Sequence, residues 1–303
     1  MNWRVYPAGV PVAELIERAE EARARGDSVG AGNWYFHAKR RGATGAADRI
    51  AALVPELESA VAHGDADAKA LLAAVLLDRG SDLGRAARLF GEAADAGVVE
   101  AMREWGFMLT NGVGVARDPV RANALFRKAA EAGDGYAAFN LSVNCYQGVG
   151  GMRNFREFSR WLRVAAELGI PEACAVLGDQ LARKGSDAES LAWYVKAAES
   201  GHAPAMFAAA GRYRDGIGCA ADPVQAVRWF LTMLDRNNGD GVHEAIKLAR
   251  SMTPDQIREA GRLSGLRIRG GIADAVLVSR ALSLTRSTCR GHCHRTAGRA
   301  AAG

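Results

Sequence analysis

The chain has 303 residues, of which 49% are hydrophobic and 7% aromatic, and its formal net charge is +5. It contains no stretch of about 18 apolar residues, which excludes a membrane-spanning helix. Residues 1–21 lack an apolar run long enough for a signal peptide, so we expect a cytoplasmic protein.

Two helices are expected at the start of the chain. Residues 12–25 have an amphipathic pattern, and residues 31–41 are rich in aromatic side chains and precede Gly42. The residues that follow contain a repeated pattern, described below. Residues 1–47 would form an N-terminal helical cap that covers the open face of these repeats, although a divergent repeat is an equally good interpretation. Residues 43–47 are expected to be a short linker.

Residues 118–150 form a unit that the middle of the chain repeats, and they predict two helices joined by tight turns. In the first helix, apolar residues occupy one face at the i, i+3, i+4, i+7 and i+8 positions: Ala122, Leu125, Phe126, Ala129 and Ala130. Gly133 marks the helix end, because glycine adopts the left-handed conformation at little cost. Asp134 is expected to cap the second helix, and a turn with Gly148 and Gly150 ends the unit.

The same pattern occurs on both sides of this unit. A pair of alanines recurs at intervals of 36, 36 and 32 residues, a period typical of helical solenoids: Ala93-Ala94, Ala129-Ala130, Ala165-Ala166 and Ala197-Ala198. A stop glycine follows each pair: Gly97, Gly133, Gly169 and Gly201. Nine residues later comes a small residue, which would let two helices approach closely: Gly106, Ser142, Gly178 and Ala210.

These residues resemble the Sel1-like repeat, a relative of the tetratricopeptide repeat. Segments 110–133 and 214–230 match its motif closely, whereas the turns at 79–82 and 184–187 are shortened and lack the Gly-x-Gly pattern. The resemblance implies an all-α fold, a right-handed α-solenoid of antiparallel helix pairs, which we place at residues 48–241. Neighbouring repeats would bury a continuous core that one repeat alone could not bury.

Several helix starts carry capping signals. At Asp118-Pro119 and Asp222-Pro223, aspartate can accept hydrogen bonds from free N–H groups, and proline at the first helical position loses no hydrogen bond. We expect residues 242–264 to form C-terminal capping helices, the last of them capped by Thr253.

Positive charge is concentrated at the end of the chain. From Arg262 onward there are eight arginines and one acidic residue, which gives the tail a charge of +7 and the rest of the chain −2. We expect residues 265–303 to form a basic, disordered tail, with a short helix at 272–284 as its one candidate element. An arginine arm that binds RNA, DNA or an anionic surface is one interpretation. The other interpretation is an extension without such a role. It is favoured because no aromatic residues lie between the arginines to stack on bases.

Two recurring features are candidates for partner binding. An acidic residue follows each alanine pair: Asp95, Glu131, Glu167 and Glu199. Stacking would align these carboxylates into a strip for a basic peptide, but a solvated helix face is more common, and Glu131 could pair with Arg127. Tryptophans recur at equivalent positions: Trp161, Trp193 and Trp229. They could anchor a partner, although their place on the apolar stripe favours packing between repeats.

Residues typical of catalytic or metal sites are scattered. Four histidines belong to different units and have no recurring Ser or Cys partner, so we expect surface histidines and no catalytic residue: His37, His63, His202 and His243. Four possible zinc ligands are too crowded for a tetrahedral site: Cys289, His292, Cys293 and His294. The Gly-x-Gly turns precede helices without a preceding strand, which indicates turns rather than phosphate loops. We therefore expect no metal and no cofactor.

The cysteines support an intracellular location. There are five cysteines: Cys145, Cys174, Cys219, Cys289 and Cys293. The first three occupy different positions in their repeats, and an odd, irregular set is expected for reduced thiols in a cytosolic protein.

Sel1-like proteins often act as adaptors in signalling or assembly. The resemblance therefore implies a non-enzymatic scaffold that holds a protein or peptide partner in the solenoid groove and has no small-molecule substrate. The alternative is nucleic-acid or anionic-surface binding through residues 265–303. A hydrolase is a third hypothesis, since some Sel1-like proteins have been credited with cell-wall or drug-binding activity. The lack of an export signal and of a Ser-x-x-Lys motif argues against it.

Overall fold

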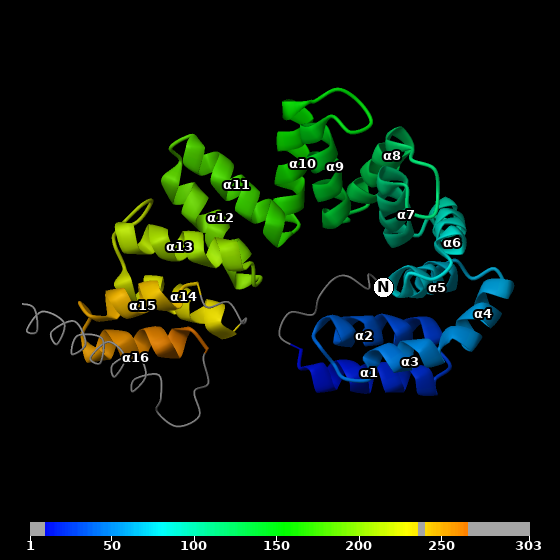
Figure 1. Cartoon of the computed structure of the whole chain (residues 1–303), viewed down its shortest axis with the longest axis horizontal. Coiled ribbons are helices and arrows are strands. Elements are labelled where there is room, and N and C mark those ends of the chain that lie inside the picture. Colours follow the sequence, from blue (N-terminus) through cyan, green and yellow to red (C-terminus); the bar gives the residue numbers. More distant parts are fainter. Residues whose placement is uncertain (1–9, 236–239, 266–303) are drawn as a thin grey trace, which may run out of the picture. The chain divides into compact units, whose positions relative to one another are not determined.

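The computed structural model describes residues 10–235 and 240–265, and within these ranges all regular structure is α-helical. The chain divides between Leu168 and Gly169 into two compact units (Figure 1). The first unit contains α1 (Val12–Ala24), α2 (Ser28–Arg40), α3 (Ala46–Ala52), α4 (Val54–Ala62), α5 (Ala66–Arg79), α6 (Leu83–Asp95), α7 (Val99–Asn111), α8 (Pro119–Glu131), α9 (Gly135–Gln147) and α10 (Phe155–Glu167). The second contains α11 (Pro171–Arg183), α12 (Asp187–Glu199), α13 (Ala203–Asp215), α14 (Pro223–Asp235), α15 (Val242–Ala249) and α16 (Pro254–Leu263).

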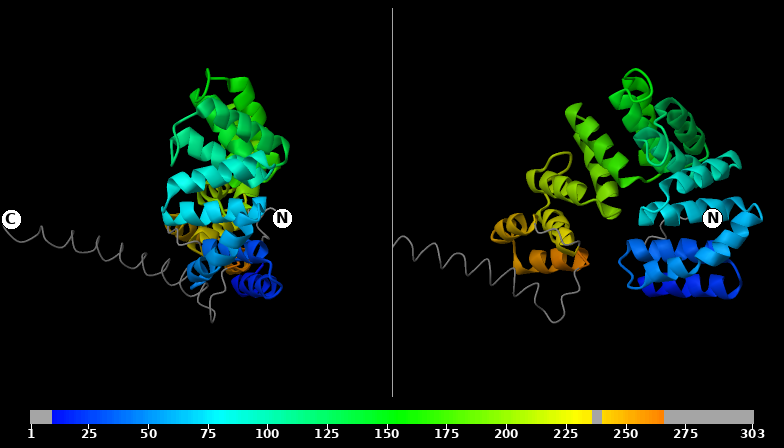
Figure 2. Two further views of the ribbon diagram at one scale, coloured as in Figure 1. Left: turned by 90° about the vertical axis from the view of Figure 1, so that its right-hand side faces the viewer. Right: turned by 45° about the vertical axis from the view of Figure 1, so that its right-hand side comes forward.

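Consecutive helices pack side by side within each unit (Figure 2). From α5 to α10 and from α11 to α14, each helix contacts the next, and short turns make neighbours antiparallel (Figure 1). The prediction of an all-α solenoid built from helix pairs is confirmed. Among the described residues, no helix has both the length and the apolar character needed to cross a bilayer.

The capping residues predicted from the sequence lie where they were expected. Asp118 Oδ1 accepts a hydrogen bond from Arg121 N at 3.0 Å, and Asp222 caps α14 in the same way. At the start of α16, Thr253 and Gln256 form a reciprocal capping box. Gln256 N donates to Thr253 Oγ1 at 3.3 Å, and Thr253 N donates to Gln256 Oε1 at 2.9 Å. These bonds satisfy N–H groups that the first helical turn leaves without a partner.

Small residues lie where a helix ends and where two helices of a pair meet. The four stop glycines have φ between 83° and 95°, a left-handed conformation that ends the helix. The alanine pairs that precede them are at most 5% exposed. A Cβ atom on Gly106 would lie 2.8 Å from Cε1 of Phe126, so α7 and α8 approach more closely than a larger side chain would allow. The predicted close approach is confirmed.

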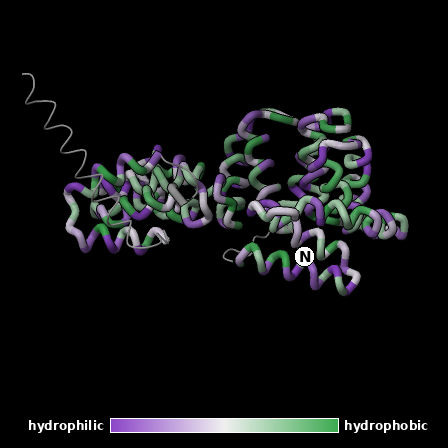
Figure 3. The backbone as a smooth tube through the Cα atoms, turned by 60° about the horizontal axis from the view of Figure 1, so that its bottom comes forward, coloured by the Kyte–Doolittle hydropathy of each residue, from purple (hydrophilic) through white to green (hydrophobic). Residues whose placement is uncertain are grey.

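Hydrophobic and hydrophilic residues are interspersed along each helix, as Figure 3 shows. Apolar residues lie on the faces that meet a neighbouring helix, and a large side chain before each alanine pair is buried: Phe90, Phe126, Leu162 and Tyr194. Burial of each such side chain contributes about 1.5–3 kcal/mol to the stability of the helix pair.

The N-terminal helices differ from the expectation in two details. α2 starts at Ser28 rather than at residue 31, because Asp27 caps it and accepts a hydrogen bond from Gly30 N at 2.7 Å. α3 begins at Ala46, so the expected linker at residues 43–47 is shorter. The assignment of residues 1–47 as a cap and of 242–264 as capping helices stays a prediction. The basic tail lies outside the described residues, apart from Gly265.

Candidate functional site

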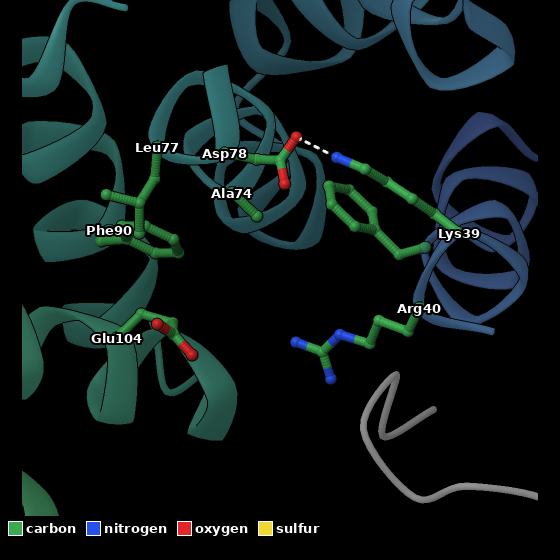
Figure 4. Close-up of a pocket in the computed structure, with 8 residues that line it drawn as sticks. Lys39, Arg40, Ala74, Leu77, Asp78, Phe90 and Glu104 are labelled. Carbon is green, nitrogen blue, oxygen red and sulfur yellow. Dashed lines mark hydrogen bonds and ion pairs between the residues drawn. The ribbon is translucent and has the colours of Figure 1, made fainter. Parts of the chain in front are cut away.

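A pocket of about 290 Å³ lies in the first unit, between α2, α5, α6 and α7 (Figure 4). We call it the α2–α7 pocket. It is lined by Phe36, Lys39, Arg40, Ala74, Leu77, Asp78, Phe90 and Glu104. Its volume is close to the lower end of the roughly 300–1,000 Å³ typical of small-molecule sites and is large enough for one large side chain.

Next to the pocket, α2 packs on α5. A Cβ atom on Gly32 would lie 2.5 Å from Cδ2 of Leu71, so a larger residue here would require the Leu71 side chain to shift. Phe36 lies one helical turn beyond Gly32, and Lys39 and Arg40 lie one turn further on the same face. These three side chains line the pocket from α2.

Charges of both signs surround the apolar floor. Lys39 of α2 forms an ion pair with Asp78 of α5 on one side of the pocket (Figure 4). On the other side, Arg40 extends from α2 toward the region where the Glu104 carboxylate lies (Figure 4). The pocket thus offers a cationic and an anionic end beside its apolar surface.

The anionic end belongs to a buried charge cluster. Arg103 Nε donates to Glu104 Oε1 at 3.2 Å, and Arg103 Nη1 donates to the carboxylate of Asp134. Asp134 caps α9, since its Oδ1 accepts from Ala137 N at 2.9 Å. The side chains of Arg103 and Asp134 are 2% exposed, and that of Glu104 is 9% exposed. The Glu104 carboxylate is therefore the acidic group at this end of the pocket.

The lining residues define what the pocket can do. Phe36, Phe90, Ala74 and Leu77 provide apolar contact, and the charged groups can orient a polar end. None of the eight lining residues is a serine, cysteine or histidine. The arrangement fits binding of a side chain with an apolar body and a polar tip.

One predicted surface histidine is buried. His37 is 4% exposed, so the expectation that it lies on the surface is wrong. Burial, with smaller contributions from Arg40 and Arg41, lowers the pKa of His37 from its usual 6.5 to about 4. His63 and His243 are exposed as expected, and His202 is half-exposed and caps α13.

The four acidic residues after the alanine pairs are all exposed, at the ends of α6, α8, α10 and α12. The possible pair between Glu131 and Arg127 does not form. Arg127 instead lies 3.5 Å from Glu157 of α10 and above the ring of Trp161, because α8 and α10 present these groups to each other. A binding strip for a basic peptide stays a prediction.

Two of the three recurring tryptophans pack inside. Trp161 and Trp229 are 3% and 2% exposed, which confirms packing between helices for both. Trp193 is half-buried, and Lys196 Nζ lies 4.8 Å from its ring centroid. The described cysteines are free thiols: Cys145, Cys174 and Cys219. Cys289, His292, Cys293 and His294 lie outside the described residues.

Sequence patterns did not indicate the α2–α7 pocket, although one signal was present. Arg103 and Glu104 occupy a helix face where the next repeat has Phe139 and Asn140. The corresponding positions of α5, α9, α11 and α13 hold no charged residue, so the charged pair in α7 indicates a local role.

A family model described as Sel1 repeat matches residues 66–98, 99–134, 135–170, 171–202 and 203–238, which together are more than half of the chain. Each matched segment contains one helix pair, from α5 and α6 to α13 and α14. The chain therefore belongs to the Sel1 repeat family.

A curated relative and two solved structures extend this result. Chitin synthase regulatory factor 3 of Schizosaccharomyces pombe is 28% identical over 170 residues, which are 52% of this chain and 18% of that protein. The chain thus spans less than a fifth of the length of this relative.

The crystal structure of a Sel1 repeat protein from Oxalobacter formigenes has a TM-score of 0.62 and 22% identity, and the match covers 78% of this chain and 76% of that one. The structure of c5321, a protective antigen of uropathogenic Escherichia coli strains, has a TM-score of 0.52 and 21% identity, with 91% and 71% covered. At these identities the likeness concerns the fold.

Proposed function

We propose that this chain is a non-enzymatic scaffold that holds a protein or peptide partner, with the α2–α7 pocket as an anchor point for one partner side chain. Sel1 repeat proteins commonly serve as scaffolds for protein interactions. The relative from Schizosaccharomyces pombe is named a regulatory factor, and a non-catalytic role here is consistent with that name.

The observation that carries the proposal is the lining of the pocket. Phe36 and Phe90 are at most 7% exposed and give the pocket a rigid apolar floor. A partner side chain on this floor would lie between Arg40 and Glu104, whose opposite charges would select its orientation. A buried apolar anchor with a polar rim is the usual arrangement of a protein interaction hot spot.

Site-specific photo-crosslinking in the native cell tests the proposal. A benzophenone amino acid replaces Leu77, which lines the pocket and is half-exposed. The matched control carries the same group in place of Arg88, which is exposed on α6. We expect a defined protein to crosslink at position 77 and not at position 88.

The captured protein is then purified and its Kd is measured with the wild-type chain and with Arg40→Gln. Loss of one orienting charge is expected to weaken binding by about three- to tenfold. Equal crosslinking at both positions, or an unchanged Kd, would contradict a role of the pocket.

A further inference from the structure

A cluster of large apolar side chains is exposed at the turn between α9 and α10. Met152 is 93% exposed, Phe155 61% and Tyr146 52%. The Tyr146 ring contacts Phe155 edge-on, with centroids 5.8 Å apart, and Phe158 at 5.0 Å. We call these four residues the α9–α10 patch. A group of aromatic rings that contact each other and remain open to solvent is characteristic of an interaction surface.

The solenoid fold does not require these aromatic residues. Phe155 occupies the first position of α10, where α8 and α14 have Pro119 and Pro223. Three residues later in the helix comes Phe158, where α8 has the buried Ala122. The repeats that contain α8 and α14 form the same helix pair with proline and alanine at these positions, so the helix pair does not need the two rings.

The turn that carries the patch is held in place. A Cβ atom on Gly150 would lie 2.5 Å from Pro119 O, so the turn rests directly on the start of α8. Asn123 Nδ2 donates to Val149 O at 2.7 Å, and Asn144 Nδ2 donates to Asn123 Oδ1 at 2.8 Å. A turn fixed by such contacts presents its side chains without a large entropy loss on binding.

Positive charge is concentrated in the sequence next to the patch. Arg153, Arg156 and Arg163 are exposed, and none of them forms an ion pair among residues 10–235 and 240–265. The neighbouring acid, Glu157, already accepts from Trp161 Nε1 at 3.0 Å and lies 3.5 Å from Arg127. These arginines are therefore available to an anionic partner.

We propose that the α9–α10 patch binds an acidic peptide segment of a protein partner, one that carries aromatic or long aliphatic side chains among its carboxylates. This inference rests on the scaffold function proposed above and names a second surface and its partner chemistry. Residues 146–163 contain Tyr, Phe, Met and Arg but no Lys, the composition that distinguishes protein interfaces. The arginines would pair with the carboxylates while the rings bury the apolar side chains.

The test titrates the full chain with a fluorescent peptide of glutamate, aspartate, tryptophan and leucine. One variant changes the patch, and a second changes a charge next to it in the sequence. Phe155→Pro deletes a ring and keeps a residue that suits the first helical position, and Arg156→Gln deletes one charge. We expect about tenfold weaker binding for Phe155→Pro and about threefold for Arg156→Gln, with a weaker salt dependence in the second case.

Matched controls come from the second unit. Ile217→Ser removes an exposed apolar side chain from the turn between α13 and α14, and Lys184→Gln removes an exposed cation. Both should bind the peptide like the wild type. Thermal melting by circular dichroism checks that every variant is folded, and Arg156→Gln, at an exposed site, keeps the test decisive if Phe155→Pro fails to fold.

Several results would overturn the inference. These are no binding by the wild type, equal binding of a peptide with glutamine in place of its acids, or equal losses in patch and control variants. Binding to phosphatidylserine vesicles but not to the peptide would assign the patch to a membrane. A dimer that Phe155→Pro dissociates would assign it to a second copy. If the peptide does not bind while a defined protein still crosslinks at position 77, the scaffold function stands without this surface.

Discussion

Arg103 joins two helices through charge rather than through apolar contact. It lies in α7, and its guanidinium binds the carboxylates of Glu104 and of Asp134, the cap of α9. Replacing Arg103 by Met would remove a cation that pairs with two buried carboxylates. We expect Arg103→Met to lower the free energy of unfolding by about 3–5 kcal/mol, measured by urea denaturation at neutral pH.

Arg88→Met is the matched control, because Arg88 is exposed on α6. It should change the free energy of unfolding by less than about 0.5 kcal/mol. Equal effects of the two substitutions would show that the buried cluster adds nothing to stability.

His37 should make stability depend on pH. Its folded pKa of about 4 lies below the usual 6.5, so the unfolded chain binds the proton first as the pH falls. The contribution of His37 is complete above about pH 6.5 and is lost as the pH falls to about 4. With an allowance for solvent screening, we expect a loss of roughly 2 kcal/mol over this range. Urea denaturation at several pH values measures it.

His37→Phe keeps a ring of similar shape and should remove this part of the pH dependence. His63→Gln is the control, since His63 is exposed on the surface at the end of α4. If the pH dependence of His37→Phe equals that of the wild type, other groups cause it.

At the scale of helices and turns, the Gly-x-Gly turn between α9 and α10 gives a paired prediction. Gly150 has φ of 75°, and a Cβ atom there would lie 2.5 Å from Pro119 O. Next to it, Gly151 has nothing within 4 Å of a Cβ atom. Gly150→Ala should therefore cost about 2 kcal/mol or more, and Gly151→Ala less than about 0.5 kcal/mol, in thermal or urea denaturation. Similar costs would mean that the turn does not rest on α8.

The starts and ends of the helices could be predicted from the sequence because each depends on residues only a few positions apart. Asp118 caps a helix within three residues, and Gly133 ends one through its own backbone conformation. The linker at 43–47 was predicted too long because no cap or stop signal marks the start of α3, where Gly45 precedes the helix without a side-chain bond.

The α2–α7 pocket could not be predicted in the same way. Lys39 and Glu104 are far apart in the sequence and share the pocket only because α2 packs on α5. The burial of His37 has the same origin in tertiary packing, and a local pattern does not reveal it. The α9–α10 patch did leave a signal, since Phe155 replaces the proline found in two other copies. Comparing each repeat with its neighbours, rather than with a motif, would have found it.

At the scale of the whole chain, repeat architecture predicts that damage stays local. Each helix contacts mainly its neighbours in the sequence, so stability is a sum of helix-pair and nearest-neighbour terms. Hydrogen–deuterium exchange measured by mass spectrometry can follow each helix separately in Arg103→Met. Amide exchange should accelerate in α7, α8 and α9, which the lost cluster joins, and change little in α13 and α14. A uniform acceleration across both units would instead mean that the chain unfolds as one cooperative body. In that case the substitution in one repeat would destabilise every surface of the scaffold at once.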